Sequence, residues 1–217
     1  MKYKAMIFDL DGTLLDTLQD LANAVNAALE VNGLPTRTVD EVRRFVGNGV
    51  RNLMIRAIPQ GEAYPEFEKV LADFRAHYAL HCKDETKPYE GILELLSTLK
   101  QQGVKMAIVS NKLDSAVKVL AEDYFKGYFG AAIGDLEGVE KKPAPDMVYK
   151  ALEELGVSRE DAIYVGDSDV DIMTAMNAGM PCVSVTWGFR DRDFLMFHGA
   201  SQFAEHPEEL VAICTEK

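Results

Sequence analysis

The chain has 217 residues, 47% of them apolar, which is enough to bury a core as one large domain or two small ones. Asp and Glu number 35 against 23 Lys and Arg, so the formal net charge is −12. This balance argues against DNA or RNA as partners, and the apolar content argues against disorder. No apolar run reaches the about 18 residues that a membrane span needs, and the start lacks a signal-peptide layout. We therefore expect a cytoplasmic protein without a membrane partner.

The first predicted element is a short apolar strand, Ala5-Met6-Ile7, that runs into Phe8-Asp9-Leu10-Asp11-Gly12-Thr13. Asp9 ends the strand and Gly12 permits a sharp turn, so both carboxylates are expected at the carboxyl edge of a sheet. One of them can contact a reacting phosphorus there while the other contacts the leaving group. Because Asp and Gly also favour turns for local reasons, this motif alone leaves a purely structural interpretation open.

Four amphipathic helices are predicted next, with no strand between them. Apolar residues recur at helical spacing, and Asp16 with Gln19 and Thr38 with Glu41 have the pattern of capping boxes. Glycine and proline interrupt the helical pattern between the helices. Successive helices of this kind predict a small bundle, so we assign residues 16–85 to an inserted cap domain.

From Pro88 onward, helices alternate with short apolar strands. We predict strands at 104–109, 131–133, 162–165 and 182–185, with helices at 92–100, 115–122, 145–155 and up to 178. Parallel strands joined by single helices need right-handed crossovers, which builds a parallel sheet covered on both faces. The first strand must rejoin this sheet, so residues 1–15 and 86–217 are predicted to form the core domain, with the insert as a lid.

Polar residues stand where the later strands end. Ser110 follows a strand directly, so its hydroxyl and the adjacent amides can grip a phosphoryl oxygen, although an ordinary helix cap is the simpler role. Lys142 precedes Pro143 and would offer a phosphoryl group a positive charge. Lys141 is the alternative if the register is shifted by one residue.

Carboxylates at these strand ends predict a magnesium site. A phosphate ester repels an anionic nucleophile, so attack by a carboxylate requires a cation, and Mg²⁺ suits oxygen ligands. Asp9 and Asp167 each follow an apolar run and are the expected side-chain ligands. Asp171 lies one helical turn beyond Asp167, where it could hold a metal-bound water or orient a lysine.

Four motifs resemble, in this order, those of the haloacid dehalogenase superfamily of phosphotransferases: Asp9-x-Asp11-Gly12-Thr13, Ser110-Asn111, Lys142-Pro143 and Gly166-Asp167-Ser168-x-x-Asp171. The insert between the first two motifs is similar to the helical-cap subclass of that superfamily. The resemblance implies an α/β fold: a Rossmann-like parallel sheet with helices on both faces plus an inserted four-helix cap domain.

The resemblance also implies roles for single residues. Asp9 would be the nucleophile that becomes an aspartyl phosphate, and Asp11 would protonate the leaving oxygen and then deprotonate water. The backbone carbonyl of Asp11 would join Asp9 and Asp167 around Mg²⁺, and Thr13 would orient Asp11 or its loop. Three residues would hold the phosphoryl oxygens: Ser110, Asn111 and Lys142.

One segment of the insert, 45–54, is similar to the cap loop of bacterial phosphoglycolate phosphatases. Glycines flanking Asn48 would let backbone amides approach a small substrate, and Arg51 could pair with a carboxylate. A plain turn and a solvated arginine are the alternative. We therefore expect a magnesium-dependent phosphatase, most similar to phosphoglycolate phosphatase, that hydrolyses a small phosphorylated metabolite and acts as a monomer or homodimer.

Other functions fit the same motifs. A sugar-phosphate mutase of the β-phosphoglucomutase type, a nucleotidase and a pyrophosphatase would share the core chemistry and differ in what the cap admits. A phospho-receiver signalling module also holds an aspartyl phosphate with acids, a hydroxyl residue, a lysine and magnesium. Such a module lacks a second acid at the position of Asp11 and would not need a helical cap.

Overall fold

The computed structural model describes residues 2–215 and divides into two compact units. A core unit contains the chain up to Leu15 and from Pro88 onward, and a helical unit contains Asp16–Lys87. Each unit has its own buried apolar core, so the two are described separately.

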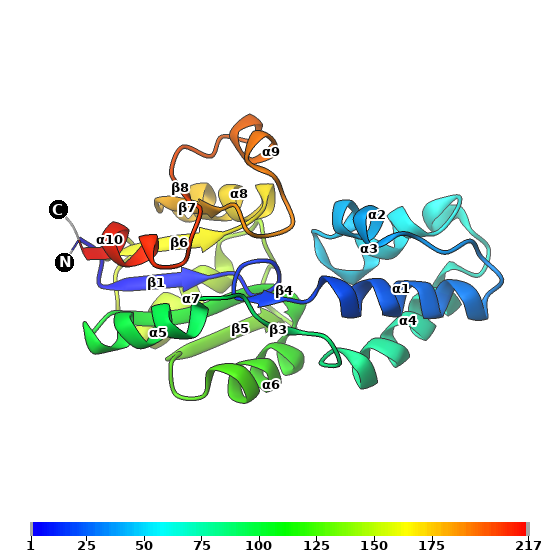
Figure 1. Ribbon diagram of the computed structural model, residues 1–217, viewed down its shortest axis with the longest axis horizontal. Helices are drawn as coiled ribbons and strands as arrows, with labels where there is room; N and C mark the ends of the chain where they lie inside the picture. Colours follow the sequence, from blue (N-terminus) through cyan, green and yellow to red (C-terminus); the bar gives the residue numbers. More distant parts are fainter. Residues whose placement is uncertain (1, 216–217) are drawn as a thin grey trace. The chain divides into compact units, whose positions relative to one another are not determined.

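The core unit is built on a six-stranded sheet in the order β5-β4-β1-β6-β7-β8, with parallel pairing throughout (Figure 1). Its strands are β1 (Ala5–Phe8), β4 (Lys105–Leu113), β5 (Ala131–Asp135), β6 (Ala162–Gly166), β7 (Cys182–Val185) and β8 (Phe203–Ala204). The predicted parallel sheet is confirmed. Strand β8 was not predicted, and β4 continues to Leu113, beyond its predicted end at residue 109.

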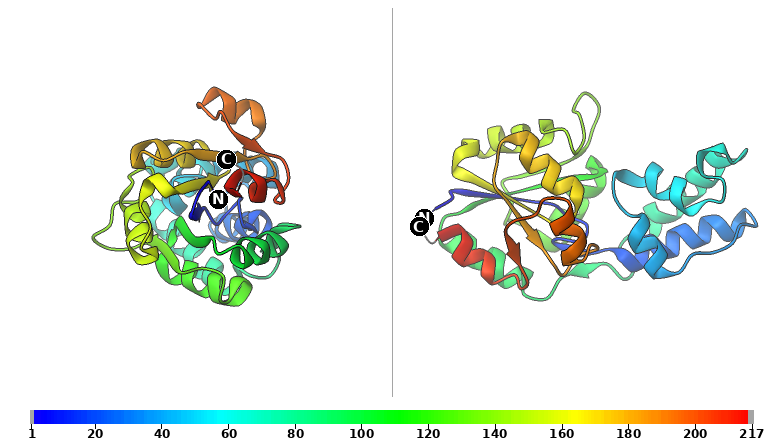
Figure 2. Two further views of the ribbon diagram at one scale, coloured as in Figure 1. Left: turned by 90° about the vertical axis from the view of Figure 1, so that its left-hand side faces the viewer. Right: turned by 90° about the horizontal axis from the view of Figure 1, so that it is seen from above.

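Helices cover both faces of this sheet, as Figure 2 shows. They are α5 (Ile92–Gln101), α6 (Asp114–Phe125), α7 (Asp146–Leu155), α8 (Asp169–Ala178) and α10 (Glu209–Thr215). A further short helix, α9 (Arg192–Phe197), lies between β7 and β8 along the chain. Side chains of a strand alternate between the two faces, so Met6 and Phe8 of β1 join the apolar cluster with α5, α6 and α10, whereas Ala5 and Ile7 join the cluster with α7 and α8. All four are fully buried, which makes β1 the centre of the core.

The helical unit contains α1 (Leu18–Val31), α2 (Val39–Phe45), α3 (Gly49–Ala57), a short 3₁₀ turn η1 (Gly61–Ala63) and α4 (Phe67–His81). Thr38 and Glu41 form the predicted capping box at α2. The capping box predicted for Asp16 and Gln19 is wrong, because α1 begins one residue later, after Thr17. Asp16 instead accepts a hydrogen bond from the N–H of Leu18 at 3.3 Å.

Two short strands pair where the chain passes between the units, β2 (Leu15–Asp16) and β3 (Lys87–Pro88). Within the helical unit, buried Asp20 of α1 accepts hydrogen bonds from the N–H groups of Glu85 and Thr86, at 3.0 Å and 2.9 Å. A buried carboxylate is stable only with such donors. These bonds hold the end of the helical segment against α1.

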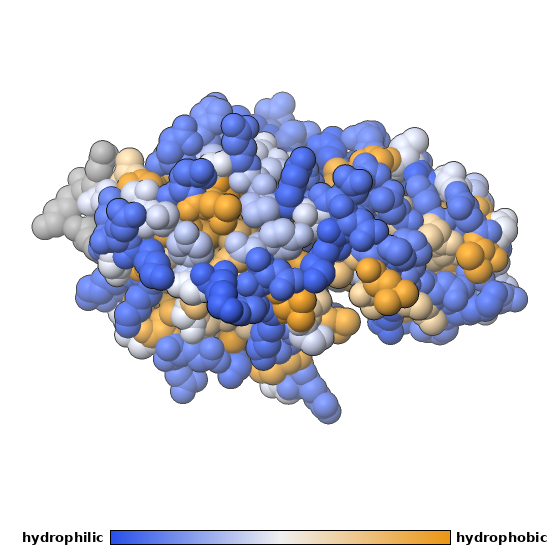
Figure 3. Space-filling view, turned by 60° about the horizontal axis from the view of Figure 1, so that its bottom comes forward, coloured by the Kyte–Doolittle hydropathy of each residue, from blue (hydrophilic) through white to orange (hydrophobic). Residues whose placement is uncertain are grey.

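Exposed large apolar side chains occur on several different helices, such as Val31 on α1, Leu80 on α4 and Phe197 on α9. The face drawn in Figure 3 is largely hydrophilic, with apolar side chains in separate patches. Scattered exposure of this kind is usual in folded proteins. Within residues 2–215, no helix combines the length and the apolar character that crossing a bilayer requires.

Candidate active site

Asp9 follows the central strand β1. Its N–H donates to the carbonyl of Val165 at 2.9 Å, which extends the β1–β6 pairing one residue beyond Phe8. The chain proceeds from β1 to β4 and β5 on one side of the sheet, and then to β6, β7 and β8 on the other. Open α/β sheets bind ligands beyond the carboxyl ends of their strands at such a reversal. The fold therefore places Asp9 where a ligand site is expected.

Three buried carboxylates converge there, because oxygens of Asp9, Asp167 and Asp171 lie within 4.8 Å of one another. Asp167 follows β6, and Asp171 lies in the first turn of α8. Burial, together with the charge of Asp171, raises the pKa of Asp167 to about 7. The same two causes raise the pKa of Asp9 well above its ordinary value. A site that gathers this much negative charge away from water suits a cation.

Lys142 supplies positive charge to the cluster. Its Nζ lies 2.9 Å from Asp9, 2.8 Å from Asp171 and 3.2 Å from the hydroxyl of Tyr164. Burial alone would lower the pKa of Lys142, but the charges of Asp171 and Asp9 outweigh it and raise this pKa. Lys141 is half exposed and lies 3.5 Å from Asp135, so the structure places Lys142 rather than its neighbour in the cluster.

Asp171 is engaged on both of its carboxylate oxygens. Oδ1 accepts from Lys142 and from the Tyr164 hydroxyl, while Oδ2 accepts from the N–H and hydroxyl of Ser168. Of the two roles considered for Asp171, this geometry favours the orientation of a lysine.

Tyr164 was not predicted from the sequence because it lies within an apolar strand. A tyrosine in a buried strand must find a partner for its hydroxyl, and that was the available signal.

Asp167 is held by two donors from other segments. Oδ2 accepts from the N–H of Phe189 at 2.7 Å, and Oδ1 accepts from the hydroxyl of Thr13 at 3.3 Å. Thr13 was expected to orient Asp11 or its loop. Its hydroxyl contacts Asp167, which a later segment brings within reach, so the contact that the structure shows joins this loop to Asp167. Trp187 donates its indole N–H to the carbonyl of Thr13 at 3.0 Å, which secures the loop after β1.

Two glycines let the backbone approach Asp167 closely. A Cβ atom on Gly12 would lie 2.4 Å from an Asp167 carboxylate oxygen, and one on Gly188 would lie 2.5 Å from the same oxygen. Gly12 also has a φ of +83°, a conformation that side-chain-bearing residues rarely adopt. Both positions therefore require glycine if Asp167 is to remain where it is.

Ser110 and Asn111 lie within β4 rather than at a helix start. Helix α6 begins at Asp114, so the helix-cap interpretation of Ser110 is wrong. Ser110 is buried, and its hydroxyl accepts from the N–H of Lys112 at 3.3 Å. Asn111 donates its side-chain amide to the carbonyl of Lys142 at 2.9 Å. Asn111 therefore ties β4 to the loop that carries the buried lysine.

Asp11 is not one of the three acids of the buried cluster. Its carboxylate pairs instead with buried Lys112, at 2.9 Å. Lys112 was not among the residues predicted from the sequence. The available signal was a lysine two residues after Ser110, because residues two apart share one face of a strand.

The two residues that were expected to select the substrate, Asn48 and Arg51, lie in the helical unit. Asn48 precedes α3 with a φ of 61°, and its carbonyl accepts from the side chain of Asn52 at 2.8 Å. The Arg51 guanidinium lies 2.6 Å from Glu62 and 2.7 Å from Glu68. A substrate carboxylate at Arg51 would have to compete with these two acids.

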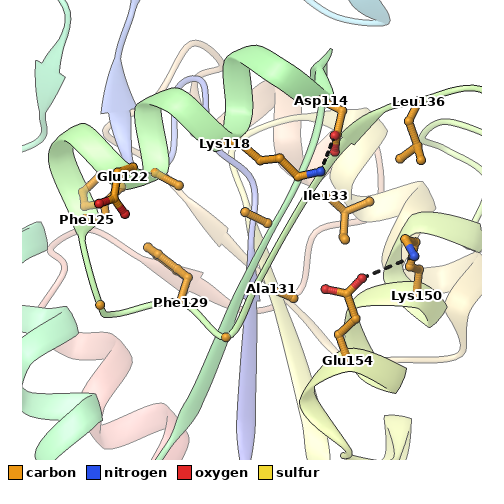
Figure 4. A pocket seen from close by; sticks show the side chains of 14 residues that line it. Asp114, Lys118, Glu122, Phe125, Phe129, Ala131, Ile133, Leu136, Lys150 and Glu154 are labelled. Atoms are coloured by element: carbon orange, nitrogen blue, oxygen red, sulfur yellow. Dashed lines mark hydrogen bonds and ion pairs between the residues drawn. The ribbon is translucent and has the colours of Figure 1, made fainter.

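A separate open pocket of about 490 Å³ lies beside the edge strand β5, between α6 and α7 (Figure 4). Its two lysines are paired with acids of the same helices: Lys118 with Asp114 at 2.6 Å, and Lys150 with Glu154 at 3.3 Å. The acid cluster takes no part in its lining. The pocket is therefore distinct from the site around Asp9.

The model of the haloacid dehalogenase-like hydrolase family matches residues 6–185 of the chain. The chain belongs to this family. Among curated relatives, it is 38% identical over 187 residues to a phosphoglycolate phosphatase of Aquifex aeolicus, and the match covers 86% of each chain. A phosphoglycolate phosphatase of Pseudomonas aeruginosa is 36% identical over 192 residues, 86% of this chain and 70% of the relative.

Comparison of the fold with solved structures is consistent with this family assignment. A crystal structure from Lactobacillus delbrueckii, described as a candidate phosphoglycolate phosphatase, matches with a TM-score of 0.95 and 40% identity over the full length of both chains. A CbbY structure from Rhodobacter sphaeroides in complex with xylulose-1,5-bisphosphate matches with a TM-score of 0.75 and 25% identity over 96% of each chain. The predicted Rossmann-like α/β fold and the predicted enzyme class, a phosphoric monoester hydrolase, are confirmed.

Proposed function

We propose that the chain is a magnesium-dependent phosphatase that hydrolyses a small phosphomonoester through an aspartyl phosphate on Asp9. The observation that supports this most directly is the position of Asp9 at the end of the central strand, 2.9 Å from buried Lys142 and inside the three-acid cluster. A carboxylate in these surroundings can bond to phosphorus, and covalent catalysis divides one difficult displacement into two easier steps.

The donor set of the cluster fits a divalent cation, because Mg²⁺ prefers oxygen ligands and the cluster offers carboxylate oxygens. In our proposal the carboxylates of Asp9 and Asp167 and the backbone carbonyl of Asp11 hold the ion. Asp171 plays a supporting role, because its oxygens are engaged by Lys142 and Ser168. A cation bound there would neutralise the negative charge that makes a phosphate ester repel an anionic nucleophile.

The side chains supply the nucleophile, the proton transfers and the positioning. The Asp9 carboxylate attacks phosphorus while protonated Asp11 gives its proton to the departing ester oxygen. Asp11 then takes a proton from water as the water oxygen attacks phosphorus, which releases phosphate and restores Asp9. Lys142 and the buried hydroxyl of Ser110 hold the phosphoryl oxygens in both steps, and Asn111 secures the backbone of Lys142.

We further propose phosphoglycolate as the substrate class and residues 16–85 as a cap domain that takes part in its selection. Curated relatives from Aquifex aeolicus and Pseudomonas aeruginosa carry the name phosphoglycolate phosphatase. The segment around Asn48 is also similar to the cap loop of such enzymes. Phosphoglycolate, a small phosphate ester that bears a carboxylate, agrees with both of these observations.

A phosphate-release screen tests the proposed function. The panel contains phosphoglycolate, sugar phosphates, nucleotides and pyrophosphate, each with Mg²⁺ and with a chelator. We expect the highest kcat/KM for phosphoglycolate and no release once the chelator has removed the metal. Undiminished release in the chelator would contradict the metal dependence, and a preference for another ester would contradict the substrate. Isomerisation of sugar phosphates would support the mutase, and a stable phosphoprotein without turnover would indicate a receiver module.

Replacing Arg51 with alanine tests its role in substrate selection. If Arg51 binds the substrate carboxylate, Arg51→Ala should raise KM for phosphoglycolate about ten-fold or more and leave KM for esters without a carboxylate unchanged. Steady-state kinetics with both kinds of ester measure this difference. Arg44→Ala, which removes another exposed arginine of the helical unit, is the matched control. An equal effect of Arg51→Ala on all esters would count against the role.

A further inference from the structure

Lys112 and Asp11 form an ion pair within the core unit. Lys112 Nζ lies 2.9 Å and 3.2 Å from the two carboxylate oxygens of Asp11. The exposed fractions of these side chains are 6% for Lys112 and 19% for Asp11. Lysine is almost never buried unless it is paired, and burial makes such a pair far less sensitive to solvent screening than a surface ion pair. The contact therefore restricts the position of the Asp11 carboxylate.

Strand β4 places Lys112 beside Asp11 because the strand continues beyond Ser110. It ends only at Leu113, and its pairing with β5 is irregular between Val109 and Leu113. The hydroxyl of Ser110 accepts from the N–H of Lys112, which fixes the backbone between these two residues. Lys112 is therefore positioned by a strand that lies directly beside β1, the strand that carries Asp9.

Each of the two carboxylates that the proposed mechanism uses for bond formation and proton transfer faces a buried ammonium group, although Lys142 is shared with Asp171. Lys142 pairs with Asp9, and Lys112 pairs with Asp11. The Asp11 carboxylate is not one of the three in the acid cluster, and the contact that fixes its position is the one with Lys112. A side chain outside the cluster is available for proton transfer, while the backbone carbonyl of the same residue belongs to the proposed cation site.

We propose that Lys112 is a positioning residue that holds the Asp11 carboxylate in place for proton transfer. This role rests on the proposed phosphatase function. During attack by Asp9, the proton on Asp11 passes to the ester oxygen as the P–O bond breaks. During hydrolysis, one proton of the attacking water passes to Asp11 while the hydroxyl joins phosphorus. Lys112 keeps its own proton throughout, so its contribution is orientation.

Leaving-group dependence distinguishes this role from a purely structural one. The alkoxide that leaves phosphoglycolate needs a proton, whereas the anion that leaves p-nitrophenyl phosphate is stable without one. We expect Lys112→Met to lower kcat/KM for phosphoglycolate about 10- to 100-fold and to lower kcat/KM for p-nitrophenyl phosphate by less than about three-fold. We expect Lys112→Arg to restore part of the loss, because it retains the charge. Lys118→Met, which removes an exposed ion-paired lysine of α6, is the matched control.

A double-mutant cycle gives a second readout. If Lys112 acts through Asp11, then Lys112→Met should cause no further loss of kcat/KM in an Asp11→Asn background. Equal losses on both esters, additive losses in the cycle, or an unchanged or higher rate for Lys112→Met would each overturn the proposal. Lys112→Gln serves the same cycle if Lys112→Met does not fold. Failure of the unmodified enzyme to hydrolyse either ester would instead overturn the proposed function, and this role with it.

Discussion

Asp9→Asn is expected to lower the rate of phosphate release by about 10⁴-fold or more, because it removes the proposed nucleophile. The fold should remain intact. Burial and the charge of Asp171 raise the pKa of Asp9, which means that the ionised form of Asp9 is disfavoured in the folded, metal-free protein. Asparagine removes one of these crowded charges and leaves Lys142 its second partner, Asp171, at 2.8 Å. We therefore expect a Tm in chelator equal to or higher than that of the unmodified protein.

Three measurements check this expectation: phosphate release at saturating substrate, thermal unfolding in chelator, and mass spectrometry for covalent phosphate on the protein. The matched control is Asp161→Asn, which alters an exposed carboxylate paired with Lys4 at the opposite end of β1. The control should retain full activity. Near-normal turnover by Asp9→Asn would remove the proposed mechanism, and a large drop in its Tm would show that Asp9 has a structural role.

Lys142→Met is expected to cost about 3–5 kcal/mol of unfolding free energy and to abolish turnover. The side chain of Lys142 is 2% exposed, and the ammonium is the cation that faces Asp9 and Asp171 at 2.9 Å and 2.8 Å. Removing one partner of a buried charge pair leaves the other charge uncompensated, which is strongly destabilising. Denaturant unfolding of the metal-free protein measures the loss.

The pH dependence of this loss has a defined sign. Burial and Asp171 raise the pKa of Asp167 to about 7, and they also raise the pKa of Asp9. As pH falls through about 7 the Asp167 carboxyl takes up a proton, and the raised pKa of Asp9 acts in the same direction, so the negative charge that Lys142 offsets diminishes. The destabilisation by Lys142→Met should therefore be smaller at about pH 5 than at about pH 8.

Lys141→Met is the matched control for this experiment. Lys141 is the adjacent residue, but its side chain is 51% exposed and lies 3.5 Å from Asp135. Exposed pairs of this kind contribute about 0–1 kcal/mol, so the control should be close to the unmodified protein in stability and activity. Comparable losses in the two variants would contradict the assignment of Lys142 to the site.

Local patterns predicted most of the elements. The buried run of β1, the alternation of helix and strand after Pro88, and the capping box of Thr38 and Glu41 depend on neighbouring residues along the chain. Their signals are therefore present in any short window of sequence. The short elements β8, α9 and α10 were not predicted. A strand of two residues such as Phe203–Ala204 has no periodicity of its own and exists through pairing with β7.

The end of β4 shows why the helix-cap alternative for Ser110 was plausible from the sequence. Ser110, Asn111 and Lys112 are polar and follow an apolar run, which locally resembles the start of a helix. The strand continues because Leu113 pairs with Asp135 of β5, a residue 22 positions later in the chain. Pairing over such a separation leaves no trace in the local pattern. The helix-cap interpretation of Ser110 failed for this reason.

The sequence by itself determined the residue types that can perform the chemistry and the strand ends where they lie. Asp9, Lys142 and Asp167 could be named in advance because strand, turn and motif signals are local. Only the tertiary structure decided which groups pair: Thr13 with Asp167, and Lys112 with Asp11. The physical reason is that a hydrogen bond or ion pair depends on distances of about 3 Å between atoms that folding alone brings together.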